Sequence, residues 1–347
     1  MRILVTGGAG FLGSALVWGL NARGYDDIWI ADFLGTSSKW RNLSPLRFSE
    51  YLEADRLRER LDRLPEFGLV LHMGACSATT EADATYLIDN NYEYTRELAR
   101  WALPRKTRMV YASSAATYGD GSAGMQDSTA VLERLRPLNA YGFSKHLFDR
   151  MAYREGWLEQ LVGLKYFNVF GPNEAHKGDM RSLVDKAFEQ VTRTGRLGLF
   201  KSYRPDFADG QQRRDFLYVK DAVDMTLFLA FHPYARGLYN LGSGVASTWL
   251  ELADALFAAM GRDPDIDFIE MPEELRGRYQ YFTQADLSRL RGQGYTGQLT
   301  PLADAIGEYV KDYLMPDRRL GDESAGLERK TSLPEVFGQL DKSPRKE

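Results

Sequence analysis

The sequence predicts an α/β protein: a doubly wound parallel sheet joined to a smaller α/β lobe. The first observation is an apolar run at residues 3–5 that passes through a glycine-rich turn into a helical pattern. The second is the alternation of strand-like and helical patterns in the first half of the chain, which is typical of a parallel sheet with helices on both faces. The third is size, because 347 residues with 44% hydrophobic content can bury a large core.

The turn after the first strand carries three regularly spaced glycines, Gly7, Gly10 and Gly13. The first can make a tight turn, the second lets a pyrophosphate approach the backbone, and the third lets the helix lie close to the sheet. Asp32 ends the next apolar run, 19 residues after Gly13, where an acid can bind a ribose hydroxyl. A plain turn between packed elements would explain the glycines alone. Together with the acid, they indicate a Rossmann dinucleotide site.

The remaining elements follow in order along the chain. The first half is expected to hold strands at 28–31, 69–73, 109–112 and 161–167, a charged amphipathic stretch at 53–64, and helices at 89–101 and 139–154. The second half is expected to hold a helix at 180–193, a loop at 195–214, strands at 215–219 and 238–241 that return toward the sheet, a helix at 248–260, a strand at 266–269 and a helix at 300–314. Small residues at 74–77 follow a strand, on the side of the sheet where ligands bind.

Composition and charge exclude several function classes. A net charge of −4 argues against a nucleic-acid partner and against a polybasic membrane patch. No apolar run approaches the roughly 18 residues of a membrane span. A single cysteine and a start without a signal-like segment favour a cytoplasmic enzyme. No metal is expected, because metal-ligand spacing is not found among the histidines His72, His146, His176 and His232.

Tyr141 and Lys145 stand four residues apart in a predicted helix, so their side chains share a face. The spacing alone would usually mark a surface pair, but here it follows a dinucleotide turn and a strand that ends at Ser113 and Ser114. A lysine ammonium and an oxidised nicotinamide can lower a tyrosine pKa from about 10, a shift of roughly three units costing about 4 kcal/mol. We therefore expect Tyr141 to act as a base in hydride transfer, with Ser114 holding the substrate oxygen and Lys145 also binding the nicotinamide ribose.

These features resemble the extended short-chain dehydrogenase/reductase family and, within its epimerase/dehydratase group, the enzymes that epimerise ADP-heptose at C6. The resemblance spans residues 1 to about 315. It rests on the stretches GACSATTE (74–81), DNNYEYTREL (89–98), YASSAATYGDG (111–121), PLNAYGFSKHLFD (137–149), KYFNVFGPNEAHKG (165–178), RRDFLYV (213–219) and GRYQYFTQADL (277–287). It implies a Rossmann domain at 1–168 plus 213–242, a substrate-binding lobe at 169–212 and 243–315, and a homo-oligomer.

The resemblance makes Lys177 a second acid/base that also borders the cofactor. Such a group is needed chemically, because the oxidised carbon must rotate before hydride returns to its opposite face, and rotation carries the oxygen away from Tyr141. The cofactor residues that the resemblance implies are Gly7, Gly10, Phe11, Leu12, Gly13, Asp32, Phe33, Lys39, Met73, Gly74, Ala75, Cys76, Ser77, Asn90, Lys145 and Val169. The residues implied for the ADP-heptose substrate are Ser114, Asn168, Asp179, Lys186, Phe200, Lys201, Ser202, Tyr203, Arg214 and Tyr279.

Cofactor choice is open at the level of the residues. Asp32 alone favours NAD, since a carboxylate repels a 2'-phosphate, whereas Lys39 and Arg41 can compensate for its charge. The resemblance favours NADP. The chain departs from the family pattern at Ala54, where a lysine is expected near the cofactor, and at Asp179 and Lys186, where a serine and a histidine are expected near the sugar.

Two other functions remain open. Another nucleotide-sugar epimerase, such as a 4-epimerase, would share the machinery, whereas a dehydratase would require acids that the run Ser114–Thr117 lacks. A nicotinamide-binding regulator without catalysis would not need the set formed by Tyr141, Lys145 and Ser114. The tail at 316–347, with 14 charged residues among 32, is expected to be disordered or loosely docked.

Overall fold

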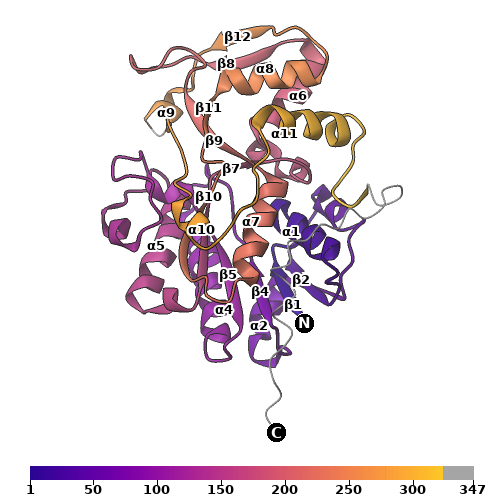
Figure 1. The fold of residues 1–347 in the computed structure, drawn as a ribbon, viewed down its shortest axis with the longest axis vertical. Coiled ribbons are helices and arrows are strands. Elements are labelled where there is room, and N and C mark those ends of the chain that lie inside the picture. Colours follow the sequence, from indigo (N-terminus) through magenta and orange to yellow (C-terminus); the bar gives the residue numbers. More distant parts are fainter. Residues whose placement is uncertain (278, 323–347) are drawn as a thin grey trace.

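The structure, a computed structural model, describes residues 1–277 and 279–322 and is built on a seven-stranded parallel sheet (Figure 1). The strand order is β10-β6-β5-β4-β1-β2-β3. The order reverses between β1 and β4, which places the end of the glycine turn at the switch point where such sheets bind ligands. The strands are β1 (Ile3–Thr6), β2 (Ile28–Asp32), β3 (Glu50–Glu53), β4 (Leu69–His72), β5 (Arg108–Ser114), β6 (Val162–Tyr166) and β10 (Gly237–Leu241).

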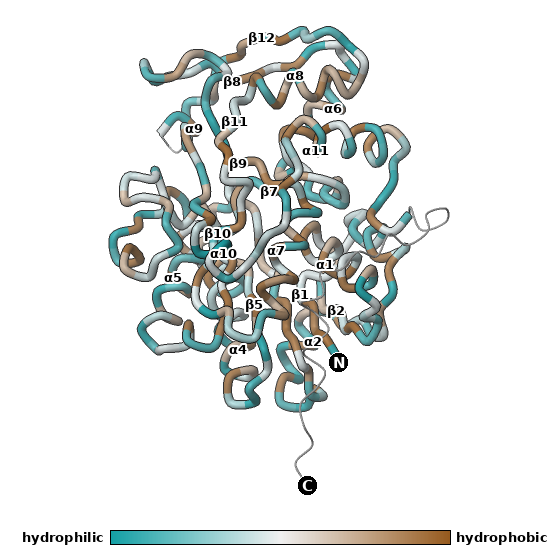
Figure 2. Tube along the Cα trace, viewed as in Figure 1, coloured by the Kyte–Doolittle hydropathy of each residue, from teal (hydrophilic) through white to brown (hydrophobic). Residues whose placement is uncertain are grey.

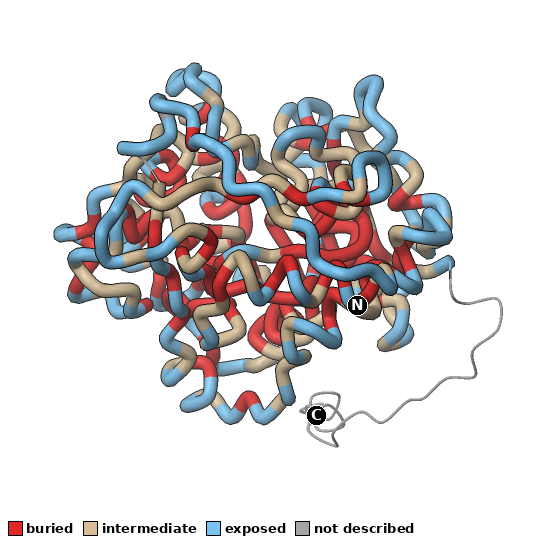
Figure 3. Tube along the Cα trace, turned by 90° about the horizontal axis from the view of Figure 1, so that it is seen from above, coloured by how far each residue is buried: buried red, intermediate tan, exposed pale blue. Residues whose placement is uncertain are grey.

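Both faces of the central sheet are buried, because successive residues of a strand point to opposite cores. Ile3 and Val5 belong to one hydrophobic cluster, whereas Leu4 between them belongs to the other. Figure 2 shows hydrophobic residues along these central strands, and Figure 3 shows buried residues inside a rim of exposed ones. Helices cover the sheet, among them α1 (Phe11–Ala22) and α7 (Val219–Phe231), which pack together, and α2 (Ala54–Glu59), α3 (Ala84–Leu87), α4 (Tyr94–Ala102) and α5 (Ala140–Arg154).

The second lobe contains two small sheets and lies beyond the carboxyl ends of the central strands (Figure 1). One sheet has the order β11-β9-β7 and the other pairs β12 with β8. Their strands are β7 (Asn168–Phe170), β8 (Leu197–Phe200), β9 (Arg213–Tyr218), β11 (Ala246–Thr248) and β12 (Ile266–Ile269). The later helices are α6 (Leu183–Thr194), α8 (Trp249–Ala259), α9 (Glu273–Arg276), α10 (Ser288–Gly292) and α11 (Leu302–Glu308).

Several elements differ from the sequence prediction. The helix expected from Asp89 begins at Ala84 with Asp83 as its N-cap, and it passes through a π-helical segment, Ile88–Glu93, before α4. Helix α7 and strands β3, β7 and β8 were not predicted; β8 lies inside the expected loop at 195–214. Strand β9 was expected to return to the central sheet but pairs with β7 and β11, because these elements gain their partners only in the folded lobe.

The start of the predicted tail is docked. Leu320 is fully buried, and its N–H donates to Asn173 Oδ1 at 3.0 Å. Residues 316–322 therefore correct the expectation of a loose tail, and residues 323–347 lie outside the described residues. Within the part of the chain that the structure describes, we find no helix that is both long and apolar enough to cross a bilayer.

Candidate active site

The glycine turn is packed so closely that two of its positions exclude any side chain. Gly7 has a φ of +66°, and a Cβ there would lie 2.7 Å from Gly74 N. A Cβ on Gly13 would lie 2.0 Å from Gly7 O, so helix α1 touches the turn. The first turn of α1 carries no acidic residue, which leaves the positive end of the helix open to a phosphate. The residues of this turn therefore fit a dinucleotide.

Asp32 is used within the protein and braces the turn. Its Oδ2 accepts from Ala9 N at 2.8 Å and from Gly10 N at 3.1 Å, while its Oδ1 pairs with Lys39 Nζ at 2.5 Å. Arg41, the second cation considered beside it, is instead paired with Asp317 at 2.8 Å. Lys39 is therefore the cation that faces the acid at the end of β2.

Ser114, Tyr141 and Lys145 come together where β5 ends and α5 begins. Asn139 caps α5 by accepting from Gly142 N at 2.7 Å, which fixes the first turn that carries Tyr141. The Tyr141 phenol is hydrogen-bonded to the Ser114 side chain. Lys145 Nζ donates to Ala112 O at 2.9 Å, and the lysine is only 5% exposed. The predicted triad is thus assembled on one strand end and one helix face.

Burial dominates the ionisation of this triad in the protein alone. Burial raises the pKa of the Tyr141 phenol above 10, and the hydrogen bond from Ser114 only partly opposes that rise. Burial lowers the pKa of Lys145 to about 8, which makes its ammonium easier to discharge near neutral pH. The lowered tyrosine pKa was predicted for a site that also holds an oxidised nicotinamide, and it stays a prediction; in the protein alone, desolvation of the phenol dominates.

A buried ionic network behind the triad fixes α5 against β5. Asp149 is fully buried and accepts from Tyr111 at 2.9 Å, Ser113 at 2.7 Å and Lys165 at 2.8 Å. Lys165 also donates to Thr117 Oγ1 at 2.7 Å. These groups anchor the strand just before Ser114 and the turn just after it. The sequence did not point to these residues, because they lie within predicted strands and a predicted helix, where no motif distinguishes them from residues that only pack.

The loop after β4 is held by Asn91, which lies in the π-helical segment Ile88–Glu93. Asn91 is fully buried; its Oδ1 accepts from Cys76 N at 2.8 Å and its Nδ2 donates to Cys76 O at 3.0 Å. Nδ2 also donates to Ser144 Oγ at 2.9 Å, which ties the loop to α5. The neighbouring Asn90, predicted at the cofactor, donates to Tyr86 O of its own helix. The π-helical segment turns the Asn91 side chain toward this loop, and a sequence pattern does not reveal a π-helix.

Lys177 lies against the start of α1, where the glycine turn ends. Its Nζ is 5.0 Å from the centre of the Phe11 ring, at the start of α1. Burial lowers the pKa of Lys177, although Glu174 and Asp185 nearby oppose the shift. No carboxylate of the described residues forms an ion pair with it, and no direct contact joins it to Tyr141.

Arg214 is the most unusual charge in the second lobe. It is 6% exposed, yet among residues 1–277 and 279–322 no carboxylate pairs with it, and its hydrogen bond goes to Arg213 O. Its guanidinium lies 5.0 Å from the Tyr279 ring and 6.0 Å from the Trp249 ring. Burial lowers the pKa of Arg214 to about 10, which leaves it charged at neutral pH.

Several other predicted substrate residues lie in the second lobe and contact neighbouring protein groups. Lys201 and Tyr203 both bind the exposed carboxylate of Glu270, and Ser202 N donates to Asp209 at 2.6 Å. Two of the three departures from the family pattern contact each other, since Lys186 Nζ donates to Asp179 O at 3.2 Å. Of the positions not yet described, Asn168 and Val169 lie on β7, Phe200 ends β8, and Ala54 begins α2.

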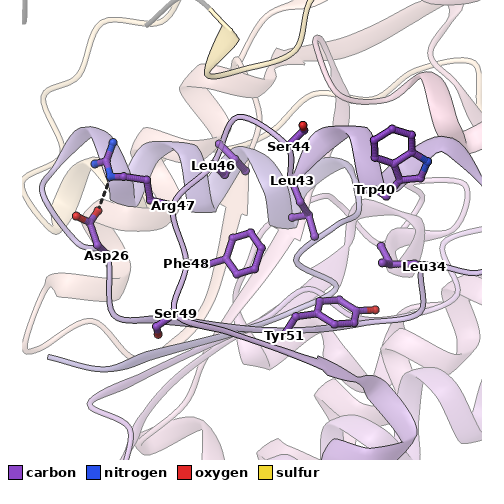
Figure 4. Close-up of a pocket in the computed structure, with 10 residues that line it drawn as sticks. All are labelled: Asp26, Leu34, Trp40, Leu43, Ser44, Leu46, Arg47, Phe48, Ser49 and Tyr51. Atoms are coloured by element: carbon purple, nitrogen blue, oxygen red, sulfur yellow. Dashed lines mark hydrogen bonds and ion pairs between the residues drawn. The ribbon is translucent and has the colours of Figure 1, made fainter.

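A pocket of about 680 Å³ lies elsewhere and is lined mainly by the segment that connects β2 to β3 (Figure 4). Most of its lining is apolar, and its charged residues, Asp26 and Arg47, pair with each other at 3.0 Å. It therefore offers no free acid or base. The described residues also contain no cluster of potential metal ligands.

Comparison with known proteins agrees with this geometry. Residues 3–242 match the model of the NAD dependent epimerase/dehydratase family. The chain is 51% identical over 314 residues to an ADP-L-glycero-D-manno-heptose-6-epimerase of Nitratidesulfovibrio vulgaris, covering 90% of this chain and 97% of the relative. It is 44% identical over 324 residues to the enzyme of the same name from Fusobacterium nucleatum, covering 90% and 98%.

Solved structures give the same fold. The ADP-L-glycero-D-manno-heptose-6-epimerase of Helicobacter pylori is 28% identical, with a TM-score of 0.76 over 90% of this chain and 95% of that one. A Thermus thermophilus UDP-glucose 4-epimerase in complex with NAD, 24% identical with a TM-score of 0.70 over 89% and 98%, shares the fold alone. The glycine turn, the triad and these matches together place the chain in the NAD dependent epimerase/dehydratase family.

Proposed function

We propose that this chain interconverts ADP-D-glycero-β-D-manno-heptose and ADP-L-glycero-β-D-manno-heptose, as an isomerase that uses NADP. The observation that carries the proposal is that two candidate acid/base groups have different surroundings, the Tyr141 phenol beside Ser114 and the Lys177 amine 5.0 Å from the Phe11 ring. Relatives at 44% and 51% identity with the name of this activity support it.

Two proton-exchanging groups suit an epimerisation better than a simple oxidation. When bound, the nicotinamide accepts hydride from C6 and later returns it. Tyr141 removes the hydroxyl proton, and Ser114 holds the oxygen by a hydrogen bond. After the oxidised group rotates, its oxygen faces away from Tyr141, and Lys177 exchanges the proton there. The lowered pKa of Lys177 suits this role, because it makes the ammonium a readier proton donor.

The loop at 74–80 supports the view that both groups serve one substrate. At its start, Cys76 lies within electrostatic range of Tyr141 and Lys145. At its end, the hydroxyls of Thr79 and Thr80 each lie 4.0 Å from Met180 Sδ, three residues beyond Lys177. One short segment therefore connects the surroundings of the two acid/base groups.

Arg214 supports a substrate with a diphosphate. A buried guanidinium without a carboxylate partner is costly unless an anion completes it, and guanidinium groups bind phosphate oxygens in pairs. The proposed division keeps 1–168 and 213–242 as the dinucleotide-binding domain and 169–212 and 243–315 as the substrate-binding lobe, except that β9, which carries Arg214, pairs with β7 and β11 and so belongs with the substrate-binding lobe. Lys39 supports NADP, since a cation beside Asp32 can meet a 2'-phosphate.

The test is to incubate the purified protein with ADP-D-glycero-β-D-manno-heptose and to follow the epimers by NMR. We expect conversion to a mixture of epimers without net change in nicotinamide absorbance, and NADP among the molecules released on denaturation. Tyr141→Phe and Lys177→Met should each lower kcat by about 10² to 10⁴. Each variant should still oxidise one epimer, and the two variants should favour opposite epimers.

Several results would contradict the proposal. Unchanged ADP-heptose would refute the substrate, and conversion of a UDP-hexose in a panel of nucleotide sugars would favour a 4-epimerase. If both variants lost the same half-reaction, Lys177 would not be the second acid/base.

A further inference from the structure

Trp249 is held rigidly at the first position of α8. Thr248, its neighbour, caps this helix in a reciprocal arrangement with Glu251, with hydrogen bonds of 3.0 and 2.6 Å. Strand β11 ends at Thr248 and pairs with β9 so that Ser247 lies opposite Arg214. The position of the Trp249 backbone is therefore tied directly to the strand that carries the buried guanidinium.

The indole ring of Trp249 links two residues of the proposed nucleotide site. Its Nε1 donates to the Tyr279 hydroxyl at 2.8 Å. Its ring lies 6.0 Å from Arg214 Cζ, while the Tyr279 ring lies 5.0 Å from the same atom. Its other side meets the Phe216 edge, with ring centres 5.1 Å apart. The guanidinium is thus placed between two aromatic rings that are hydrogen-bonded to each other.

The segment that carries Tyr279 needs such a connection. It follows the short helix α9 and rejoins β9 two residues later, where the Arg213 N–H donates to Tyr281 O at 2.9 Å and the Asp215 N–H donates to Thr283 Oγ1 at 3.1 Å. The Tyr279 ring packs at 78° against the Tyr281 ring, with centres 5.2 Å apart. Among the described residues, the Trp249 N–H is the hydrogen-bond donor that reaches the Tyr279 hydroxyl.

We propose that Trp249 is a positioning residue for the nucleotide of the substrate, acting through Tyr279 and Arg214. Its N–H orients the Tyr279 ring, and the two rings together hold the guanidinium toward the diphosphate of a nucleoside diphosphate sugar. This inference rests on the proposed function, because it assigns the nucleotide to the lobe that contains Arg214. Trp249 acts on binding and not on the chemical step, since it touches neither the triad nor Lys177.

The decisive variant is Trp249→Phe, which keeps an aromatic ring and removes the N–H. We expect it to weaken ADP binding by about 3- to 10-fold, the effect of one lost hydrogen bond with some loss of ring contact. KM for the ADP-sugar should rise by a similar factor, whereas kcat should stay within about twofold, because only binding is affected. A role limited to folding would lower the melting temperature and leave KM of the folded enzyme unchanged.

Coupling between Trp249 and Tyr279 gives a second measurement. Trp249→Phe, Tyr279→Phe and the double variant are titrated with ADP by calorimetry, using protein saturated with NADP so that ADP does not enter the cofactor site. Both single variants remove the same hydrogen bond, so the double variant should bind ADP no more weakly than the weaker single variant. The ADP-induced change in tryptophan fluorescence should also disappear in Trp249→Phe.

The matched control is Trp40→Phe, because Trp40 is 57% exposed and lines the pocket formed by the segment that connects β2 to β3, a pocket whose lining does not include Arg214. It should keep both the ADP affinity and the fluorescence change. Unchanged ADP affinity in Trp249→Phe, or effects that multiply in the double variant, would overturn the inference. If ADP binding shows the coupling but no ADP-sugar is turned over, the proposed function fails while the role of Trp249 stands.

Discussion

The glycine turn and the Arg214 region differ in how each balances a buried charge. Asp32 and Arg214 are 7% and 6% exposed, so both are equally withdrawn from water. Asp32 is neutralised by Lys39 at 2.5 Å and by two turn amides, whereas Arg214 has no acidic partner among the described residues. An unpaired buried charge lowers stability. The turn is therefore braced from within the protein, whereas the second lobe holds a buried cation for which we propose an anionic ligand as the partner.

The largest expected effect comes from a substitution in the glycine turn. In Gly13→Ala the added Cβ would lie 2.0 Å from Gly7 O, so α1 must move away from the turn. We expect the free energy of unfolding to fall by roughly 1–3 kcal/mol or more, and dinucleotide binding to be lost. Urea unfolding and the dinucleotide released on denaturation measure the two effects.

Gly307→Ala is the control for that substitution. Gly307 lies within α11, and a Cβ there would meet open space. Alanine should stabilise that helix by about 0.5–1 kcal/mol and leave the dinucleotide in place. If Gly13→Ala retained its dinucleotide, the close packing of the turn would not be what shapes the cofactor site.

The next largest effect concerns the unpaired charge of Arg214. Arg214→Met removes the charge but keeps a long apolar side chain, so we expect ADP affinity to fall by about 10- to 100-fold. The melting temperature should stay unchanged or rise, since an uncompensated buried charge is removed. Arg213→Met, at the exposed neighbouring position, should leave both values unchanged. A loss of stability together with normal ADP binding would mean that Arg214 is structural.

The same contrast explains what could be predicted from sequence. The turn, the first helix and Asp32 lie within 32 residues, and each follows from local backbone chemistry; the triad also follows from one helix and one strand end. The Arg214 region combines β9, α8 and the segment at 279, and its unpaired charge is visible only in the folded lobe. Trp249 carries no sequence signal, because an aromatic residue at a helix start usually means packing.

A misplaced element shows the same limit. The helix before α4 was expected to begin at Asp89, because an acid followed by asparagines suits an N-cap. The helix instead begins at Ala84, and the π-helical segment turns the Asn91 side chain toward Cys76. A buried polar side chain found its partners in another loop, and single-sequence patterns do not encode that choice.

A smaller effect is expected when the cation beside Asp32 is removed, which leaves this buried charge without its ion-pair partner. In Lys39→Met the carboxylate keeps its turn amides but loses its cation, so a 2'-phosphate would meet a net negative charge. We expect NADP affinity to fall by about 10-fold while NAD affinity changes by less than about twofold. Competition titrations with both dinucleotides measure the ratio. Arg41→Met is the control, because Arg41 is paired with Asp317.

An equal loss of NADP and NAD affinity in Lys39→Met would contradict this reading. It would mean that Lys39 stabilises the turn itself and does not select the cofactor.

The smallest effect is a pH dependence at the triad. Burial lowers the pKa of Lys145 to about 8, so its ammonium is charged below that pH and is lost as the pH rises through it. If the charge of Lys145 is what helps Tyr141 give up its proton, kcat should fall to about half its plateau near pH 8 and decline further above it. Lys145→Arg keeps the charge at every working pH, so the alkaline decline should move upward by more than one unit even if the plateau is lower.

A decline at the same pH in Lys145→Arg would assign it to another group, and the strongest candidate would be Lys177, whose pKa burial also lowers. Lys177→Met distinguishes them, because it should remove the decline only in the half-reaction that Tyr141 does not serve.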